Sequence, residues 1–195
     1  MAGRAVPKRS SRAAAAPETT REKLVRAAAA EFNERGFFST DSNRIAHRAG
    51  FAPQTFYRWF KDKTAIFIAA YEQWETSERA ALEPLVVAEA PEEDLVEVAL
   101  AHHRDHLLFR RALRQLALED PAVRAARAAS RLRQIRQIKV WAHKPDLDEA
   151  WIAAELLQME RLADALAERE IADLGLSESG ARQALAAIFR RIRTA

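Results

Sequence analysis

A short polar segment around residue 55 carries the side chains of this chain best suited to molecular recognition. Gln54 ends in an amide that can donate to and accept from the edge of an adenine, and Thr55 offers a hydroxyl and a methyl group. Tyr57 and Arg58 can reach phosphates or base edges. For Trp59, packing against the next helix and contact with DNA stay open. Such groups within two helical turns are typical of a surface that binds double-stranded DNA.

Two histidines form the second group with possible chemistry. His102 and His106 are four residues apart, a spacing at which two imidazoles on one helical face can bind a metal. A site needs a third ligand, and His143 is only a loose candidate for it. We therefore predict two polar residues that line a pocket or are satisfied in the core, with no metal and no cofactor. The neighbouring His103 is expected to point elsewhere.

Three predicted helices position the polar segment. The first begins at the capping box Thr19-x-x-Glu22 and ends at Gly36. The second covers about residues 41–49, and the third about residues 53–60, with a proline at its first position. Two short helices joined by a tight glycine-containing turn, the second exposing polar and aromatic groups, are typical of a helix-turn-helix that reads DNA.

Composition favours helices and a reducing environment. Ala and Arg are abundant, and no segment shows a convincing strand pattern. The 195 residues include no cysteine, which excludes disulfides and thiolate metal sites. No apolar run approaches the roughly 20 residues that span a bilayer, and residues 1–17 lack the apolar centre of a signal peptide. We therefore expect an all-α protein that resides in the cytoplasm.

The charges are unevenly distributed along the chain. Residues 1–63 hold 13 Lys and Arg against 6 Asp and Glu, whereas residues 64–195 hold 18 against 22. A basic N-terminal third on a mildly acidic body suggests a module that binds a polyanion, and a basic tail without such a role is the alternative. Residues 1–17 are interpreted as a flexible basic arm, and its contact with DNA is left open.

A longer pattern surrounds the polar segment. Residues 31–67 read EFNERGFFSTDSNRIAHRAGFAPQTFYRWFKDKTAIF. The informative positions are Phe32, Gly36, Thr40, Ile45, Ala46, Ala49, Gly50, Thr55, Phe56, Tyr57, Phe60 and Lys63. In these residues and their spacing the chain resembles the TetR family of transcriptional regulators. The resemblance implies that Thr55, Tyr57, Trp59 and Lys63 contact DNA, and that the rest of the chain forms helices with a ligand pocket and a dimer interface.

Two positions depart from the family's pattern. Ala52 stands where the family usually has a Ser that caps the reading helix, and such a cap is worth roughly 1 kcal/mol. Asn43 stands where many members carry Arg. We expect the phosphate contact of the second helix to be weaker at Asn43 or to move to Arg44.

Apolar stripes mark the remaining helices. A fourth helix is predicted at about residues 62–82, before a break bracketed by Pro84 and Pro91. Residues 92–118 and 121–143 are predicted to enclose a mostly apolar pocket. Its proposed ligand-binding residues are His102, His106, Phe109 and Leu113.

The last two predicted helices, about residues 146–174 and 177–193, have wide apolar faces. By resemblance they form a four-helix bundle across a two-fold axis. The interface candidates are Trp151, Leu185, Ile188 and Ile192. Burial against the preceding helices is the alternative for part of this surface.

These observations predict three parts: a basic arm at residues 1–17, a helix-turn-helix domain at residues 18–63, and a helical ligand-binding and dimerisation domain at residues 64–195. The expected function is a ligand-responsive transcriptional regulator, most often a repressor that a small-molecule effector releases from operator DNA. An architectural DNA-binding protein is one alternative, but it would need no long helical domain. An enzyme is another, but the chain lacks a nucleophile–base pair, a phosphate loop and a carboxylate-rich metal motif.

Overall fold

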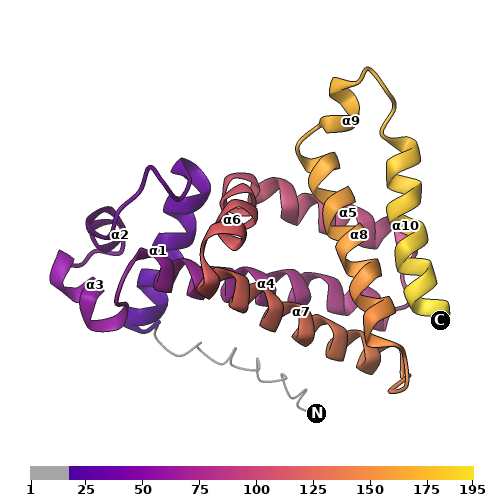
Figure 1. The fold of residues 1–195 in the computed structure, drawn as a ribbon, viewed down its shortest axis with the longest axis horizontal. Coiled ribbons are helices and arrows are strands. Elements are labelled where there is room, and N and C mark those ends of the chain that lie inside the picture. The colour runs from indigo at the N-terminus through magenta and orange to yellow at the C-terminus, as the bar shows by residue number, and fades with distance from the viewer. Residues whose placement is uncertain (1–17) are drawn as a thin grey trace, which may run out of the picture.

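A computed structural model describes residues 18–195, so the predicted basic arm lies outside the described residues. This part of the chain contains ten helices and no strand (Figure 1), which confirms the all-α prediction. The helices are α1 (Thr20–Arg35), α2 (Ser42–Arg48), α3 (Pro53–Trp59), α4 (Lys63–Val87), α5 (Glu92–Asp105), α6 (Leu107–Glu119), α7 (Pro121–Trp141), α8 (Glu149–Ala167), α9 (Glu170–Asp173) and α10 (Ser179–Thr194). None of these ten helices is both long and apolar enough to cross a bilayer.

Local capping explains where the first helices begin and end. The Glu22 backbone N–H donates to the Thr19 hydroxyl at 3.3 Å, and the Thr19 N–H donates to the Glu22 carboxylate at 2.7 Å. This is the predicted capping box. Asp41 caps α2 by accepting the Arg44 N–H at 2.9 Å. Gly36 ends α1 with a φ of 77°, which a residue without a Cβ adopts at no steric cost.

The predicted end of α4 near residue 82 is wrong. The helix runs on through Pro84 to Val87, and the Ala88 N–H donates to the Pro84 carbonyl at 3.0 Å. A proline removes one backbone donor, but it leaves its own carbonyl free to accept the next helical bond. The extra turn matters because it forms part of the wall of the central cavity described below.

Residues 92–118 form two helices, with a break at His106. The His106 backbone has φ −125° and ψ 30°, and its N–H donates to the His103 carbonyl at 3.2 Å. The His102 carbonyl instead lies 2.9 Å from Nδ1 of His106, which can donate to it when that nitrogen carries the proton. The imidazole therefore takes the place of the helical donor at the break.

The hydrophobic core consists of clusters at opposite ends of the molecule (Figure 1). The first joins α1, α2, α3, the beginning of α4 and α6, and it includes Phe32, Phe67 and Phe109. The second joins α5, α8 and α10, where Leu185 is completely buried. A smaller third cluster joins α7 and α8. Helix α4 runs from the first end toward the other. The first cluster contains residues from both sides of the predicted domain boundary at residues 63/64, so that boundary stays a prediction.

Candidate DNA-reading surface and central cavity

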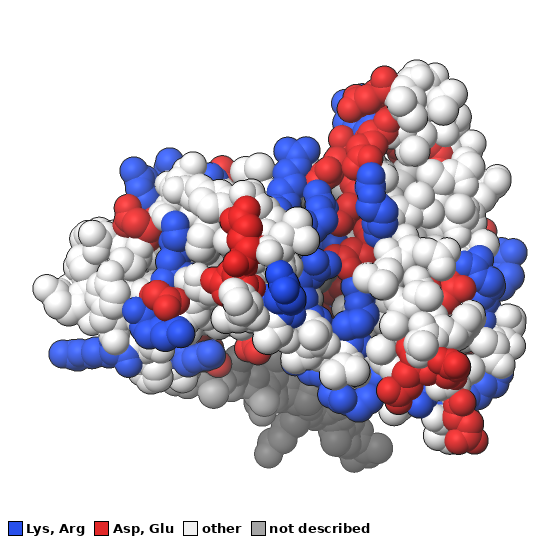
Figure 2. All heavy atoms as spheres, in the orientation of Figure 1, with Lys and Arg blue, Asp and Glu red and all other residues white. Residues whose placement is uncertain are grey.

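Helix α3 has a buried face and a polar exposed face. Phe56 and Phe60 are buried in the first cluster. Gln54 and Arg58 are exposed, and so are Tyr57 at 60% and Trp59 at 49%. Large aromatic side chains that remain this exposed are available to a partner. Figure 2 shows Lys and Arg side chains gathered along the lower edge of this end of the molecule.

The two helices of the helix-turn-helix are connected by their side chains. The Tyr57 hydroxyl lies 2.8 Å from the Ser42 hydroxyl of α2, so this tyrosine is held in place while its ring stays exposed. Asn43 and Arg44 are exposed on α2, as a contact with DNA requires. Thr55 is half-buried. The remaining sequence-predicted DNA contact, Lys63, is half-buried.

Lys63 stabilises the loop between α1 and α2. Its Nζ donates to the Phe37 carbonyl at 2.8 Å and to the Thr40 carbonyl at 2.9 Å, and it lies 4.2 Å from the centre of the Phe37 ring. Burial lowers the pKa of this amine. Its predicted contact with DNA stays a prediction, because these two carbonyls already take two of the three ammonium protons.

A buried carboxylate, which the sequence analysis missed, supports the same loop. Glu31 accepts a hydrogen bond from the Thr40 hydroxyl at 2.7 Å and another from Arg48 at 2.9 Å. Thr40 and Glu31 are both buried, so Thr40 acts from the core rather than on the surface. The apolar spacing of α1 gave no signal for a buried glutamate.

The second candidate site is a cavity of about 830 Å³ among α4, α5, α7, α8 and α10. This volume lies within the range of about 300–1,000 Å³ that is usual for small-molecule sites. Its wall includes apolar side chains, among them Leu95, Leu156 and Phe189, and charged ones, among them Arg131 and Glu160. The cavity therefore combines the apolar lining and the few polar groups that such sites share.

The four residues predicted to bind a ligand lie outside this lining. Phe109 and Leu113 are buried in the first cluster, and His106 occupies the helix break. The His102 ring packs on Trp74 at 5.0 Å, and burial lowers the pKa of His102. Within residues 18–195 no third metal ligand joins the two histidines.

His103, which was expected to point elsewhere, lines the cavity. Helix α5 turns His103 toward α8, where its Nδ1 lies 3.1 Å from an Asp164 oxygen, and its Nε2 lies 3.3 Å from Glu78 of α4. Burial acts to lower the pKa of His103, but the hydrogen bonds with Asp164 and Glu78 outweigh it and raise the pKa. His103 continues the stripe of Leu95 and Ala99 at steps of four, whereas the sequence analysis continued that stripe to His102 by a step of three.

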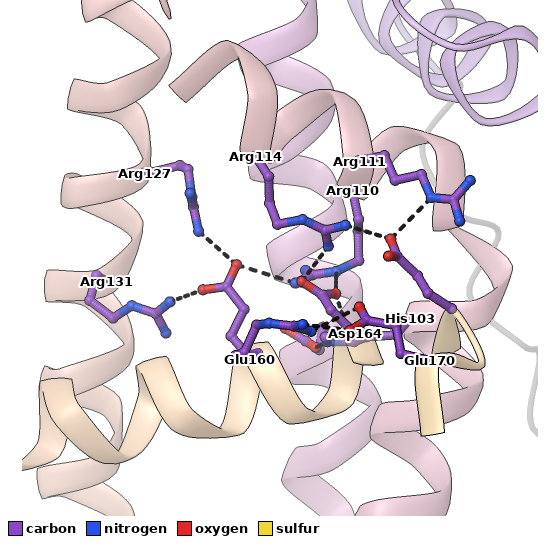
Figure 3. A network of polar contacts seen from close by, with 12 residues as sticks. His103, Arg110, Arg111, Arg114, Arg127, Arg131, Glu160, Asp164 and Glu170 are labelled. Carbon is purple, nitrogen blue, oxygen red and sulfur yellow. Dashed lines mark hydrogen bonds and ion pairs between the residues drawn. The ribbon is translucent and has the colours of Figure 1, made fainter. Parts of the chain in front are cut away.

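His103 belongs to a network of ion pairs that joins the five helices α4 to α8 (Figure 3). Arg110 of α6, with a side chain only 4% exposed, donates to Asp164 at 2.7 Å and to Glu160 at 3.2 Å. Glu160 also accepts from Arg127 at 2.7 Å and from Arg131, both of α7. Burial acts to raise the pKa of Asp164, but its hydrogen bonds with His103 and Arg110 outweigh burial and hold that pKa well below its usual range. Two arginines of α7, Arg127 and Arg131, thus point inward toward Glu160.

The predicted dimer residues lie deeper than expected. Leu185 is completely buried and Ile188 almost so, packed with Val96 and Leu100 of α5 and with α8 of the same chain. Trp151 and Ile192 are partly buried against the third cluster. Burial against the preceding helices of the same chain, the alternative given for part of this surface, therefore explains why Leu185 and Ile188 are apolar.

Residues 24–70 match the sequence model of a family described as bacterial regulatory proteins, tetR family. This range contains α2, α3, most of α1 and the beginning of α4, which together form the surface described above. Residues 24–70 are a TetR-family domain. The family resemblance of the sequence is confirmed.

A curated relative matches part of the chain. The uncharacterized HTH-type transcriptional regulator YdgC of Bacillus subtilis (strain 168) is 35% identical over 68 residues, which is 35% of this chain and 35% of that protein. The chain thus spans about a third of the length of this relative.

Two solved structures share the fold. A protein of Rhodococcus sp. named as a TetR-family transcriptional regulator has a TM-score of 0.67 and 21% identity, covering 89% of this chain and 98% of that one. A protein of Mesorhizobium loti MAFF303099, also named as a TetR-family transcriptional regulator, has a TM-score of 0.62 and 21% identity, covering 89% of this chain and 94% of that one. At this identity the likeness concerns the fold, which is TetR-like well beyond the N-terminal domain.

Proposed function

We propose that this TetR-family chain is a DNA-binding transcriptional regulator that acts as a homodimer, and that a small molecule releases it from its operator. The observation that carries the proposal is that one helix, α4, packs against the reading domain at one end and lines the central cavity at the other. An architectural DNA-binding protein would need no such cavity.

The reading surface supports recognition of a major groove. Gln54 is exposed at the beginning of α3, where it can pair with an adenine edge, and Arg58 and Tyr57 are exposed beside it. The hydrogen bond between Tyr57 and Ser42 holds α3 against α2. We assign base reading to Gln54 and positioning to Tyr57, Thr55 and the loop around Lys63.

Helix α4 supplies a route from the cavity to the reader. Ile66 and Phe67 near its beginning are completely buried in the first cluster, and Glu78 and Leu82 further along line the cavity. Tyr71 belongs to both. A ligand that prefers one position of this helix would change the distance between two reading helices of a dimer. A tenfold change in DNA affinity needs only about 1.4 kcal/mol of differential binding.

Homodimerisation is proposed through the exposed faces of α8 and α10. Leu157 of α8 is 57% exposed, and Ala154 beside it is exposed. On α10, Ala184 is exposed and Ala187 half-exposed, and the Glu155–Arg191 ion pair at 2.5 Å joins the two helices. Small side chains around one leucine allow close approach of a second copy, and a two-fold axis would pair this face with itself.

Selection of duplexes from a random library by the full chain, followed by fluorescence anisotropy, tests DNA reading. We expect an operator with two half-sites roughly 34–36 Å apart. Gln54→Ala should relax one operator position by about 1–3 kcal/mol. Lys63→Ala should weaken binding to all sequences alike and also lower the melting temperature, because it leaves the Phe37 and Thr40 carbonyls without their donor.

The exposed Gln115 of α6 offers a matched control, and Gln115→Ala should change neither affinity nor specificity. Failure of the library to enrich any sequence would contradict the proposal. Equal loss of specificity in Gln54→Ala and Lys63→Ala would contradict the division between reading and positioning.

A further inference from the structure

The central cavity has walls of two kinds. Apolar side chains from α4, α5, α7, α8 and α10 form one part, including Leu82, Leu95, Ile138, Leu156, Met159 and Phe189. The other part carries Arg110, Arg131 and His103 together with Glu160 and Glu78 (Figure 3). A molecule that fills this space must therefore be apolar over most of its length and polar at one end.

Arginine outnumbers carboxylate around Glu160. Three guanidinium groups, those of Arg110, Arg127 and Arg131, share this one side chain. Arg110 has Asp164 as a second partner, but within residues 18–195 Arg127 and Arg131 form no other ion pair. These side chains are at most 26% exposed, so water compensates their charge only in part. One further negative group would complete the pairing.

Besides Glu160, two acidic residues of the cavity are already occupied. Glu75 pairs with Arg133 at 2.5 Å, and Glu78 pairs with His103 at 3.3 Å. Glu89 and Arg79 also line the cavity, but both are exposed and neither has an ion pair in the described part of the chain. At the wall around Glu160 a cationic ligand would have to displace an arginine or His103, whereas an anion finds cations that share a partner.

We infer that the effector is an amphipathic monocarboxylate, whose carboxylate binds Arg131 beside Arg110 and whose apolar body fills the rest of the cavity. The inference rests on the proposed function, because it names the class of its ligand. A carboxylate at Arg131 competes with Glu160 and so loosens the contact of α8 with α6 and α7. Helix α6 adjoins the reading domain, since Phe109 packs on Phe67 at 4.8 Å and Asn33 of α1 donates to the Asp105 carbonyl just before α6.

Calorimetric titration of the full chain with decanoate, 1-decanol and decylamine tests the inference, because these probes share a ten-carbon chain and differ in the head group. We expect decanoate to bind at least about tenfold more tightly than the other two. Arg131→Gln should remove that preference while leaving 1-decanol affinity within about threefold of wild type. Arg136→Gln is the matched control, because Arg136 is exposed on the same helix and does not line the cavity.

Three results would overturn the inference. Equal affinity for the three probes would show that the cavity does not prefer a carboxylate. Absence of decanoate binding at millimolar concentration would exclude amphipathic monocarboxylates as the ligand class. If Arg79→Gln loses the preference for decanoate and Arg131→Gln keeps it, the carboxylate binds at Arg79 and not beside Glu160.

Fluorescence anisotropy on the selected operator separates this test from that of the proposed function. Decanoate that binds without changing DNA affinity contradicts ligand-responsive regulation alone, and specific DNA binding without decanoate binding contradicts the ligand class alone.

Discussion

At the scale of single residues, His103 is the group whose protonation has the clearest consequence. It lies between Glu78 and Asp164, with the Arg110 guanidinium and His102 also nearby, and the two carboxylates raise its pKa above the ordinary value of about 6.5. The stabilising contribution of protonated His103 is therefore fully present below about pH 6.5 and is lost as the pH rises through its folded-state pKa. We expect wild type to lose stability relative to His103→Gln over that interval.

Urea unfolding at fixed protein concentration between about pH 5.5 and 8.5 measures this difference. His102→Gln is the control of opposite sign. Burial lowers the pKa of His102, so its contribution is lost as the pH falls below about 6.5. A constant difference between wild type and His103→Gln across the pH range would show that folding does not shift the pKa of His103.

At the scale of elements, the reading helix lacks a side-chain cap. Ala52 has the extended backbone of an N-cap, with φ −68° and ψ 150°, but no side-chain acceptor for the first N–H groups of α3. Ala52→Ser supplies one without a change of backbone, so the free energy of unfolding should rise by about 0.5–2 kcal/mol. Thermal or urea unfolding of the variant measures the gain. Ala52→Val, which adds bulk and no acceptor, should not be stabilised, and equal stabilisation of both variants would rule out capping as the cause.

At the scale of the whole molecule, the proposed dimer face can be separated from the core. Leu157→Glu places a charge on the exposed face of α8, and we expect it to convert the dimer to a monomer in native mass or sedimentation measurements. Leu185→Ala should instead lower the free energy of unfolding by about 2–5 kcal/mol, because its side chain is completely buried within one chain. Leu132→Glu on α7, also at an exposed leucine, serves as the control. A dimer that survives Leu157→Glu would move the interface elsewhere.

The sequence alone determined the features that rest on local interactions. The capping box at Thr19 and Glu22, the glycine turn at Gly36 and the buried positions Phe56 and Phe60 depend on neighbours within a few residues. The helix-turn-helix and its exposed polar face could therefore be predicted. An all-α fold followed as well, because composition and helical periodicity agreed along the chain.

Only the tertiary structure decided which side chains surround the cavity. Leu95, Ala99 and His103 follow one another at steps of four on α5 and line the cavity, whereas the predicted stripe continued to His102; the apolar spacing alone could not choose between the two histidines. Glu160 and Asp164 meet Arg110 from 50 and 54 residues away in sequence. An apolar stripe also cannot show whether Leu185 is covered by its own chain or by a second copy, because both burials remove the same apolar surface from water.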